Sequence, residues 1–251
     1  MKSKLNIEEV KNTIISELKK WFSLNGEEYK AIVMLSGGKD STIVAKLCVE
    51  ALGNDKVIGV SIPDKGQTEN DADKIAEWLG IEYHVVPIEK ITKLLHETIS
   101  VGIGVENLSS QSTMNIPPRL RMLIGYAISQ TFGGRVIGTC NASENYVGYL
   151  TRWGDGASDY EPIADLTMHE VLDLGDALRI PYEWVHKLPD DGLPGSESDD
   201  KKFAKQGFSY ALLDKYILEG TSGDKSADEA IERMHKKNAF KLKMQDYPKF
   251  H

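Results

Sequence analysis

The 251-residue sequence has few cysteines, no surplus of basic residues and no long apolar run, and each shortage excludes a class of protein. Only Cys48 and Cys140 occur, without the spacing of a metal site, which favours a reducing compartment over a disulfide-stabilised secreted domain. Asp and Glu (38) outnumber Lys and Arg (30), giving a formal net charge of −8. Because affinity for nucleic acids comes chiefly from clustered basic residues, the composition disfavours a nucleic-acid partner.

Signals for membranes and secretion are missing as well. No apolar run approaches the roughly 20 residues that a membrane span needs. The opening segment MKSKLNIEEVKNTIISELKKWF is charged throughout and lacks the apolar region of a signal peptide. We therefore expect a cytoplasmic protein with no membrane partner.

Short apolar segments alternate with helix-like segments over the first half of the chain. Strand-like runs lie at 31–35, 57–62, 83–87 and 135–139, and helix-like stretches at 7–23, 40–52, 68–79, 88–101 and 117–132. This alternation predicts an α/β fold with a doubly wound, mostly parallel sheet flanked by helices. In such folds ligands bind beyond the carboxyl ends of the strands.

The last hundred residues have a different character. Further helices are predicted near 209–218 and 226–239, and no boundary indicates a second domain, so 1–251 is expected to form a single domain. The segment PDDGLPGSESDDKK is too rich in Pro, Gly, Ser and acidic residues to bury much apolar surface. We expect 189–207 to be a flexible loop, either an exposed linker or a mobile lid.

The segment LSGGKDST directly follows the first apolar run. Its two glycines let the backbone approach an anion, and the start of the next helix contributes unsatisfied N–H groups and partial positive charge. The Walker pattern does not fit because Asp40 follows Lys39. An aspartate beside a phosphate repels it unless a cation lies between them, so Asp40 suggests bound Mg²⁺. The structural alternative is a glycine turn in which Asp40 or Ser41 caps the helix.

Two further segments carry candidate binding residues. In NIPPRLRM, Pro117 and Pro118 are expected in the first turn of a helix, where a missing N–H costs nothing, and Arg119 and Arg121 point to different sides of it. In GTCNASENYVGYLTRWGDGASD, which follows a predicted strand, Asn141 and Glu144 have the spacing of a capping box. Spacing alone favours the cap over a ligand-binding role for Glu144. Arg152, Asp155 and Asp159 lie in a glycine-rich loop that could be an ordinary turn.

The loop SGGKDS resembles the S-G-G-x-D-S loop of the ATP pyrophosphatase (PP-loop) superfamily, whose members adenylate a carboxylate or carbonyl oxygen and release pyrophosphate. With N-x-x-x-R-x-R-M, G-T-x-[DN]-x-[SA]-E and [KR]-[YW]-G-D-G in the same order, the sequence is similar to the ammonia-dependent NAD synthetase family over about residues 30–180. The resemblance implies an adenine nucleotide alpha hydrolase-like fold. It also implies ATP-dependent amidation of deamido-NAD by ammonia to give NAD, AMP and pyrophosphate.

The resemblance assigns roles residue by residue. Lys39, Asp40 and Glu144 would be catalytic, and Asp40 and Glu144 would hold Mg²⁺. ATP would be bound by Met34, Leu35, Ser36, Gly37, Gly38, Lys39, Asp40, Ser41 and Thr139. Deamido-NAD would be bound by Arg119, Arg152, Asp159, Phe240 and Lys241. The family's homodimer implies a contact surface on the opening helix or the 117–132 helix.

Three positions depart from the family pattern. Met168 stands where a lysine for ATP is usual, Asp190 where Thr or Ser is frequent, and Phe240-Lys241 where a His-Lys pair is usual. These departures put the ATP side in doubt more than the dinucleotide side, although His169 or Lys187 could compensate. Two alternatives therefore stay open: another adenylating PP-loop enzyme, such as a tRNA-modifying one, and a non-catalytic paralogue that binds a dinucleotide. Glutamine-using members need a separate amidase domain for which 251 residues leave no room, so free or delivered ammonia is the expected nitrogen source.

Overall fold

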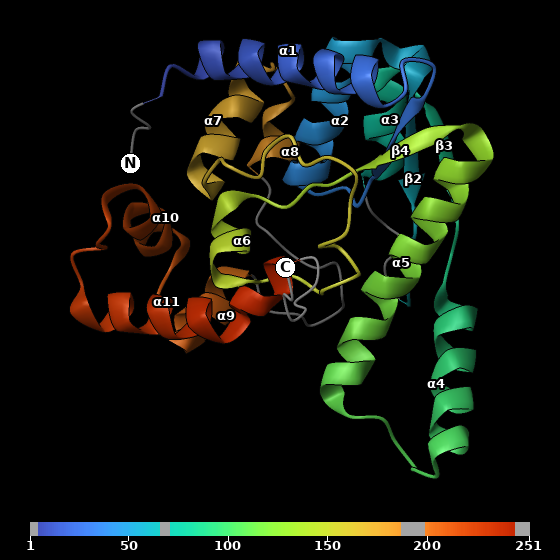
Figure 1. Ribbon diagram of the computed structural model, residues 1–251, viewed down its shortest axis with the longest axis vertical. Coiled ribbons are helices and arrows are strands. Elements are labelled where there is room, and N and C mark those ends of the chain that lie inside the picture. Colours follow the sequence, from blue (N-terminus) through green and yellow to red (C-terminus); the bar gives the residue numbers. More distant parts are fainter. Residues whose placement is uncertain (1–4, 66–70, 187–198, 244–251) are drawn as a thin grey trace, which may run out of the picture.

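The computed structural model describes residues 5–65, 71–186 and 199–243, which form helices around one central sheet (Figure 1). Four parallel strands lie in the order β3-β2-β1-β4. The strands are β1 (Lys30–Met34), β2 (Val57–Ser61), β3 (Glu82–Val85) and β4 (Gly134–Ile137). β1 and β2 are apolar along their length because helices cover the sheet on both faces.

The path of the chain through the sheet confirms the doubly wound fold. The chain enters at β1, passes to β2 and β3 on one side, and returns to the other side of β1 with β4. All three pairings are parallel, and all four predicted strands begin and end within two residues of the expected positions.

One face of the sheet carries the larger part of the core. Its helices are α1 (Ile7–Asn25), α2 (Lys39–Leu52), α3 (Ala72–Leu79), α7 (Met168–Ala177) and α8 (Tyr182–Val185). The cluster of buried apolar side chains on this face includes Ala31, Val33 and Val57 from the strands. Leu18 and Phe22 of α1 pack against them. A short 3-10 turn, η1 (Asn54–Lys56), links α2 to β2.

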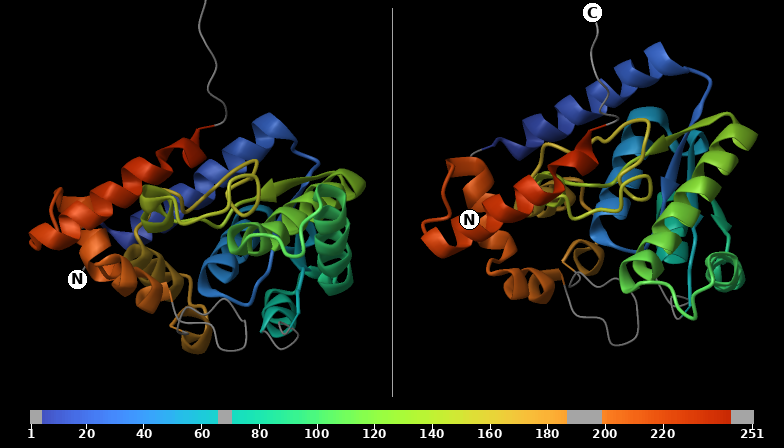
Figure 2. Two further views of the ribbon diagram at one scale, coloured as in Figure 1. Left: turned by 90° about the horizontal axis from the view of Figure 1, so that it is seen from below. Right: turned by 60° about the horizontal axis from the view of Figure 1, so that its bottom comes forward.

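The opposite face is covered by two long helices, α4 (Glu89–Ile103) and α5 (Ser110–Phe132). A smaller cluster of Ile32, Ile58 and Val60 packs beneath them with Leu120 of α5. Beyond the sheet, both helices project as an arm at one end of the molecule, whereas the C-terminal helices lie at the other end (Figures 1 and 2).

The C-terminal helices have a core of their own. These helices are α9 (Asp199–Gln206), α10 (Tyr210–Glu219) and α11 (Lys225–Asn238), followed by the 3-10 turn η2 (Ala239–Leu242), and they form a layer together with the earlier helix α6 (Ala142–Val147). Its buried cluster includes Phe203, Phe208, Tyr210 and Leu213, with Val147 from α6 and Met168 from α7. Part of the segment expected to be a loop is therefore helix α9, whose Phe203 is buried; residues 187–198 lie outside the described part of the chain.

The helix predicted over 117–132 begins seven residues earlier than expected. Ser109 caps it by accepting the N–H of Ser112 (3.2 Å), so Pro117 and Pro118 lie inside α5 rather than in its first turn. Contacts with the glycine-rich loop compensate: Thr151 Oγ1 donates to Asn115 Oδ1 (3.1 Å), and Pro118 packs so close to Gly154 that a Cβ there would lie 2.9 Å from it. Tertiary packing thus outweighs the local preference of proline for a helix start.

Across the described residues, no helix has the length and apolar character that crossing a membrane requires.

Candidate functional site at the carboxyl edge of the sheet

Two loops meet where the strand order reverses. The SGGKDS loop follows β1, and residues 138–141 follow β4, which is the strand paired with β1 on that side. Asn141 Nδ2 donates to Asp40 Oδ1 (3.3 Å), so the two loops are in direct contact. Open parallel sheets bind ligands at such a switch point, because the loops diverge there and leave a crevice.

Hydrogen bonds of serine and threonine hydroxyl groups stabilise the SGGKDS loop. Gly37 adopts φ +78°, which suits glycine, and Gly38 is the N-cap residue of α2. The Gly38 N–H donates to Ser36 Oγ (3.2 Å), and Ser41 Oγ and Thr42 Oγ1 donate to the Gly38 carbonyl (3.1 and 2.8 Å). No side chain caps α2, so the alternative in which Asp40 or Ser41 is the cap is wrong. The first turn thus keeps the anion-binding character of an uncapped helix start.

Lys39 and Asp40 form an ion pair at the start of α2. Lys39 Nζ lies 2.7 Å from Asp40 Oδ2, and the Lys39 side chain is only 8% exposed. A cation and an anion are thereby held beside the loop, both close to where a bound phosphate would meet the helix. Lys39 is thus of the type to offer positive charge to a phosphate, and Asp40 to offer a carboxylate oxygen to a metal ion.

Glu144 is part of a complete capping box and also lies near Asp40. Asn141 Oδ1 accepts the Glu144 N–H (3.0 Å), and Glu144 Oε2 accepts the Asn141 N–H (3.2 Å), so the capping interpretation is confirmed. Burial, followed by the negative charge of Asp40, raises the pKa of Glu144 from 4.5 to about 8. Such a shift indicates a carboxylate whose charge lacks compensation in the free protein. The cap and a metal-binding role therefore do not exclude each other.

The donor set fits a magnesium ion shared with a phosphate. Mg²⁺ commonly takes one or two protein carboxylates and completes its octahedron with substrate phosphates and water. Asp40 and Glu144 supply two carboxylates, and a dication between them would relieve the repulsion that raises the Glu144 pKa. No group of three or more His, Cys, Asp or Glu suited to a metal occurs among the residues that the structure describes. Two carboxylates would leave the other coordination positions of such an ion to substrate phosphates and water.

Arg119 and Arg152 meet beside the glycine-rich loop. Arg119 Nε donates to the Arg152 carbonyl (3.2 Å), whereas Arg121 Nε donates to the Ile62 carbonyl (2.9 Å) on another side of α5, as the spacing predicts. The Arg152 guanidinium lies over the rings of Trp153 (4.8 Å) and Phe240 (5.7 Å). An exposed cationic and aromatic surface results, which suits a planar anionic ligand.

Residues 238–243 are hydrogen-bonded to the loop that follows α6. Lys241 Nζ donates to the carbonyls of Gly148 (2.8 Å) and Leu150 (3.1 Å), and Arg152 Nη2 donates to the Lys243 carbonyl (2.9 Å). Burial lowers the pKa of Lys241, the direction expected of an ammonium group withdrawn from water. Lys241 therefore shapes the loop that carries Arg152.

Asp159 lies at the outer edge of the sheet. Its carboxylate accepts the Val136 N–H (2.8 Å) from β4 and the Tyr126 hydroxyl (3.3 Å) from α5. Burial, together with the nearby Asp159 charge, raises the Tyr126 pKa to about 12. In this structure Asp159 anchors the glycine-rich loop to β4.

The remaining candidates differ in how close they lie to the two loops. Thr139 is partly buried two residues beyond the end of β4, in the loop that also holds Asn141. Met168 is 8% exposed and packs in the C-terminal core with Val147 and Phe203, so the residue at the expected lysine position contributes to packing. Asp190 and Lys187 lie outside the described residues.

Sequence reasoning treated Asn141 only as a helix cap and missed its contact with Asp40. A signal was available: a capping residue directly after a predicted strand lies at the carboxyl edge of the sheet, within reach of the neighbouring strand's loop. Asp155, which the sequence assigned to an ordinary turn, also makes a specific hydrogen bond within the loop. Its carboxylate accepts the Thr151 N–H (3.0 Å).

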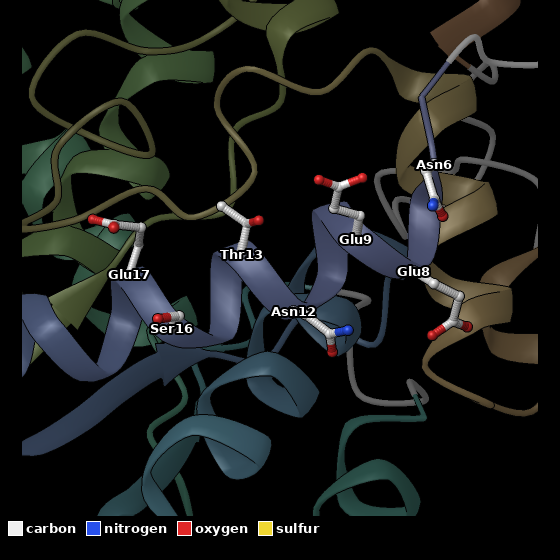
Figure 3. Close-up of a pocket in the computed structure, with 7 residues that line it drawn as sticks. All are labelled: Asn6, Glu8, Glu9, Asn12, Thr13, Ser16 and Glu17. Carbon is white, nitrogen blue, oxygen red and sulfur yellow. The ribbon is translucent and has the colours of Figure 1, made fainter.

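A shallow hollow on the outer surface of α1 is unrelated to these loops. Figure 3 shows its polar lining, which comes from this helix and the residue before it: Asn6, Glu8, Glu9, Asn12, Thr13, Ser16 and Glu17. Three glutamates make it unsuited to the anionic ligands that the SGGKDS loop favours.

Comparisons with known proteins agree with this geometry. A family model described as NAD synthase matches residues 8–245. An NH(3)-dependent NAD(+) synthetase from Pyrococcus furiosus is 34% identical over 215 residues, which are 85% of this chain and 79% of that protein.

Two solved structures resemble the fold over almost the whole chain. An NMN synthetase from Francisella tularensis superimposes with a TM-score of 0.87 at 28% identity, covering 98% of this chain and 100% of that one. An NH3-dependent NAD synthetase from Campylobacter jejuni gives a TM-score of 0.76 at 27% identity with the same coverage. Because the family model spans residues 8–245 and the Pyrococcus furiosus relative is 34% identical, the chain belongs to the NAD synthase family.

Proposed function

We propose that this protein catalyses the ATP-dependent amidation of deamido-NAD by ammonia, forming NAD, AMP and pyrophosphate. The observation that carries the proposal is the meeting of the SGGKDS loop with Asn141 and Glu144 at the switch point of the sheet. The family uses ATP as a co-substrate and forms a carbon–nitrogen bond, so the enzyme is a ligase.

The proposed reaction has two steps. The nicotinate carboxylate attacks the α-phosphorus of ATP, the bond to the β-phosphate oxygen breaks, and pyrophosphate leaves. Ammonia then attacks the adenylated carbonyl carbon, AMP departs with the bonding electrons, and the nitrogen loses a proton. No protein nucleophile is needed, so catalysis rests on positioning and on stabilising negative charge.

Residues of the loop would bind and orient the nucleotide. The N–H groups at the start of α2 and the ammonium of Lys39 would stabilise the leaving pyrophosphate, each well-placed donor contributing on the order of several kcal/mol. Asp40 and Glu144 would hold Mg²⁺, which neutralises phosphate charge when bound. The remaining ATP contacts would come from residues 34–41 and Thr139.

The dinucleotide side would be formed by Arg119, Arg152 and Phe240. The guanidinium of Arg152 between two rings supports binding of a planar, negatively charged nicotinate. Lys241 and Asp159 would act on this side by holding the glycine-rich loop in place, since their side chains bond its carbonyls and the adjacent strand.

A second candidate substrate is nicotinate mononucleotide, which the same amidation would convert to NMN. The higher TM-score to the Francisella tularensis NMN synthetase, 0.87 against 0.76 for the Campylobacter jejuni enzyme, favours including it. Both substrates present the same carboxylate to the same loop, so the chemistry proposed above is unchanged.

The test is one assay with ATP, Mg²⁺ and ammonium, run in parallel with deamido-NAD and with nicotinate mononucleotide. Pyrophosphate and the amide product should appear in equal amounts with the true substrate, and Asp40→Asn should lower turnover at least about 100-fold. The exposed Asp55→Asn serves as the matched control. Binding of deamido-NAD without either product would instead indicate the non-catalytic paralogue. Neither binding nor turnover would favour another adenylating enzyme of the superfamily.

We also propose that the chain forms one synthetase-type domain. All three core clusters surround one sheet or join it through α6 and α7, which supports a single domain.

A homodimer is proposed through the arm of α4 and α5. Large apolar side chains are exposed there in unusual number, namely Ile91, Leu94, Val101, Ile103, Val105, Met114 and Leu123. Because a monomer rarely exposes such a patch, the arm is a better contact surface than the polar outer face of α1.

A further inference from the structure

A buried carboxylate links the C-terminal helices to the carboxylate pair of the proposed metal site. Asp214 lies on α10 and is fully buried. It accepts the hydroxyl of Ser143 (2.5 Å) on one oxygen and both the N–H (3.0 Å) and the Nδ1 (2.5 Å) of His169 on the other. Three donors satisfy this charge, which would otherwise be costly to bury.

The donors come from the first turns of two other helices. Ser143 is the second residue of α6, and Met168 and His169 are the first two residues of α7. Ser143 Oγ also accepts the Met168 N–H (2.9 Å), so one hydroxyl joins both helix starts to Asp214. A negative charge at helix N-termini is further favoured by the helix dipoles.

Ser143 lies between Asn141 and Glu144 at the start of α6. Asn141, two positions earlier, holds Asp40 through its side chain, and Glu144 follows at the next position. The first turn of α6 is therefore fixed on both sides, by Asp40 at the sheet and by Asp214 at α10. Movement of this turn would change the separation of the two carboxylates.

We propose that Asp214 is a positioning residue that, through Ser143, sets the geometry of Asp40 and Glu144 for the magnesium–ATP complex. The inference rests on the proposed function, because it concerns the same site. Asp214 touches neither the phosphate loop nor Glu144 in any contact described here, so its effect is transmitted through the first turn of α6.

The experiment compares Asp214 with a less buried carboxylate of the same group of helices that also accepts a serine hydroxyl and a backbone N–H. Asp228 on α11 also accepts a serine hydroxyl and a backbone N–H, both from Ser222, together with the Thr221 hydroxyl, and none of these bonds reaches α6. In Asp214→Asn the Mg²⁺ concentration that gives half-maximal pyrophosphate release should rise about tenfold, the lower end of losses seen when groups supporting a metal ligand are removed. In Asp228→Asn it should change less than about twofold, although both variants lose stability.

Two further measurements keep the test decisive. Ser143→Ala, which leaves Asp214 bonded to His169, should reproduce the defect, and the double variant should show less than the sum of the two effects. Mn²⁺ binding in the presence of ATP, followed by electron paramagnetic resonance, requires no turnover. It therefore tests the positioning role even if neither amidation is observed, in which case only the proposed function fails. Equal metal half-saturation in Asp214→Asn, Ser143→Ala and Asp228→Asn would overturn the inference.

Discussion

At the scale of single residues, Glu144 and Asn141 combine structural and chemical roles. The capping box fixes the Glu144 backbone and one of its carboxylate oxygens, while burial, followed by the charge of nearby Asp40, raises the pKa of the same group. The sequence predicts the cap from spacing and the metal role from resemblance. It could not show that one side chain serves both, because this depends on the contact of Asn141 with Asp40, 101 positions away.

The pKa of Glu144 gives a prediction about stability and pH. Its folded value of about 8 lies above its ordinary 4.5, so the stability that it contributes is complete below pH 4.5 and is lost as the pH rises towards 8. Glu144→Gln keeps an acceptor for the cap but cannot ionise. Without divalent cations, we expect this variant to gain more than about 1 kcal/mol on the wild type between pH 5 and pH 8.5. Urea unfolding at both pH values measures this, and a constant difference would contradict it.

Met168 gives a prediction about the departure from the family pattern. Its side chain packs against Val147 and Phe203, so Met168→Leu should cost less than about 1.5 kcal/mol. Met168→Lys would place an ammonium group in this cluster and should cost about 2 kcal/mol or more. Denaturant unfolding of both variants tests this. A lysine variant that is as stable as the wild type and binds ATP more tightly would show instead that position 168 faces the nucleotide.

At the scale of elements, α5 shows how tertiary contacts displace a helix boundary. Proline at 117 and 118 predicts a start at that point, and only the packing of the glycine-rich loop on residues 115–118 explains why the helix extends back to Ser110. The contacting residues Arg119 and Arg152 are 33 positions apart, so the local sequence does not predict the contact. By contrast, α10 and α11 lie where their periodicity predicts, because their apolar faces alone determine them.

The interior prolines of α5 give a prediction at this scale. Pro117 leaves the Thr113 carbonyl without its usual intrahelical donor. Pro117→Ala should therefore raise the free energy of unfolding by about 1 kcal/mol, less than the roughly 3 kcal/mol of a helix interior, since the unfolded chain also gains freedom. Thermal unfolding measures the change. Pro118→Ala is the matched control and should gain less, because Pro118 packs on Gly154.

At the scale of the whole molecule, the sheet order determines where the site forms. Alternating apolar and helical segments were enough to predict the doubly wound sheet and the edge at which the SGGKDS loop lies. The C-terminal core could not be predicted from the sequence, because Val147, Met168 and Phe203 come from three different helices, α6, α7 and α9, that pack together only in the folded chain. The sequence pattern thus predicted the position of the SGGKDS loop but not the C-terminal helices that pack against α6, the helix that carries Glu144.

The exposed apolar arm gives a prediction about assembly. If α4 and α5 contact a second copy, the wild type should sediment as a dimer with a midpoint of thermal unfolding that rises with protein concentration. Leu94 is 64% exposed, and Leu94→Glu should shift the protein to a monomer. Leu218→Glu on α10, where the side chain is 48% exposed, should leave the dimer intact. A wild-type monomer at all concentrations would contradict the proposed interface.

The conformation of Trp153 has a practical consequence. This residue adopts φ +63°, is 49% exposed and lies under the Arg152 guanidinium, whereas Trp21, Trp78 and Trp184 are packed against other aromatic rings. Its indole emission is therefore the one most sensitive to a change in the glycine-rich loop. The protein carries an intrinsic fluorescent reporter beside its proposed nicotinate site, so substrate binding can be followed without a label.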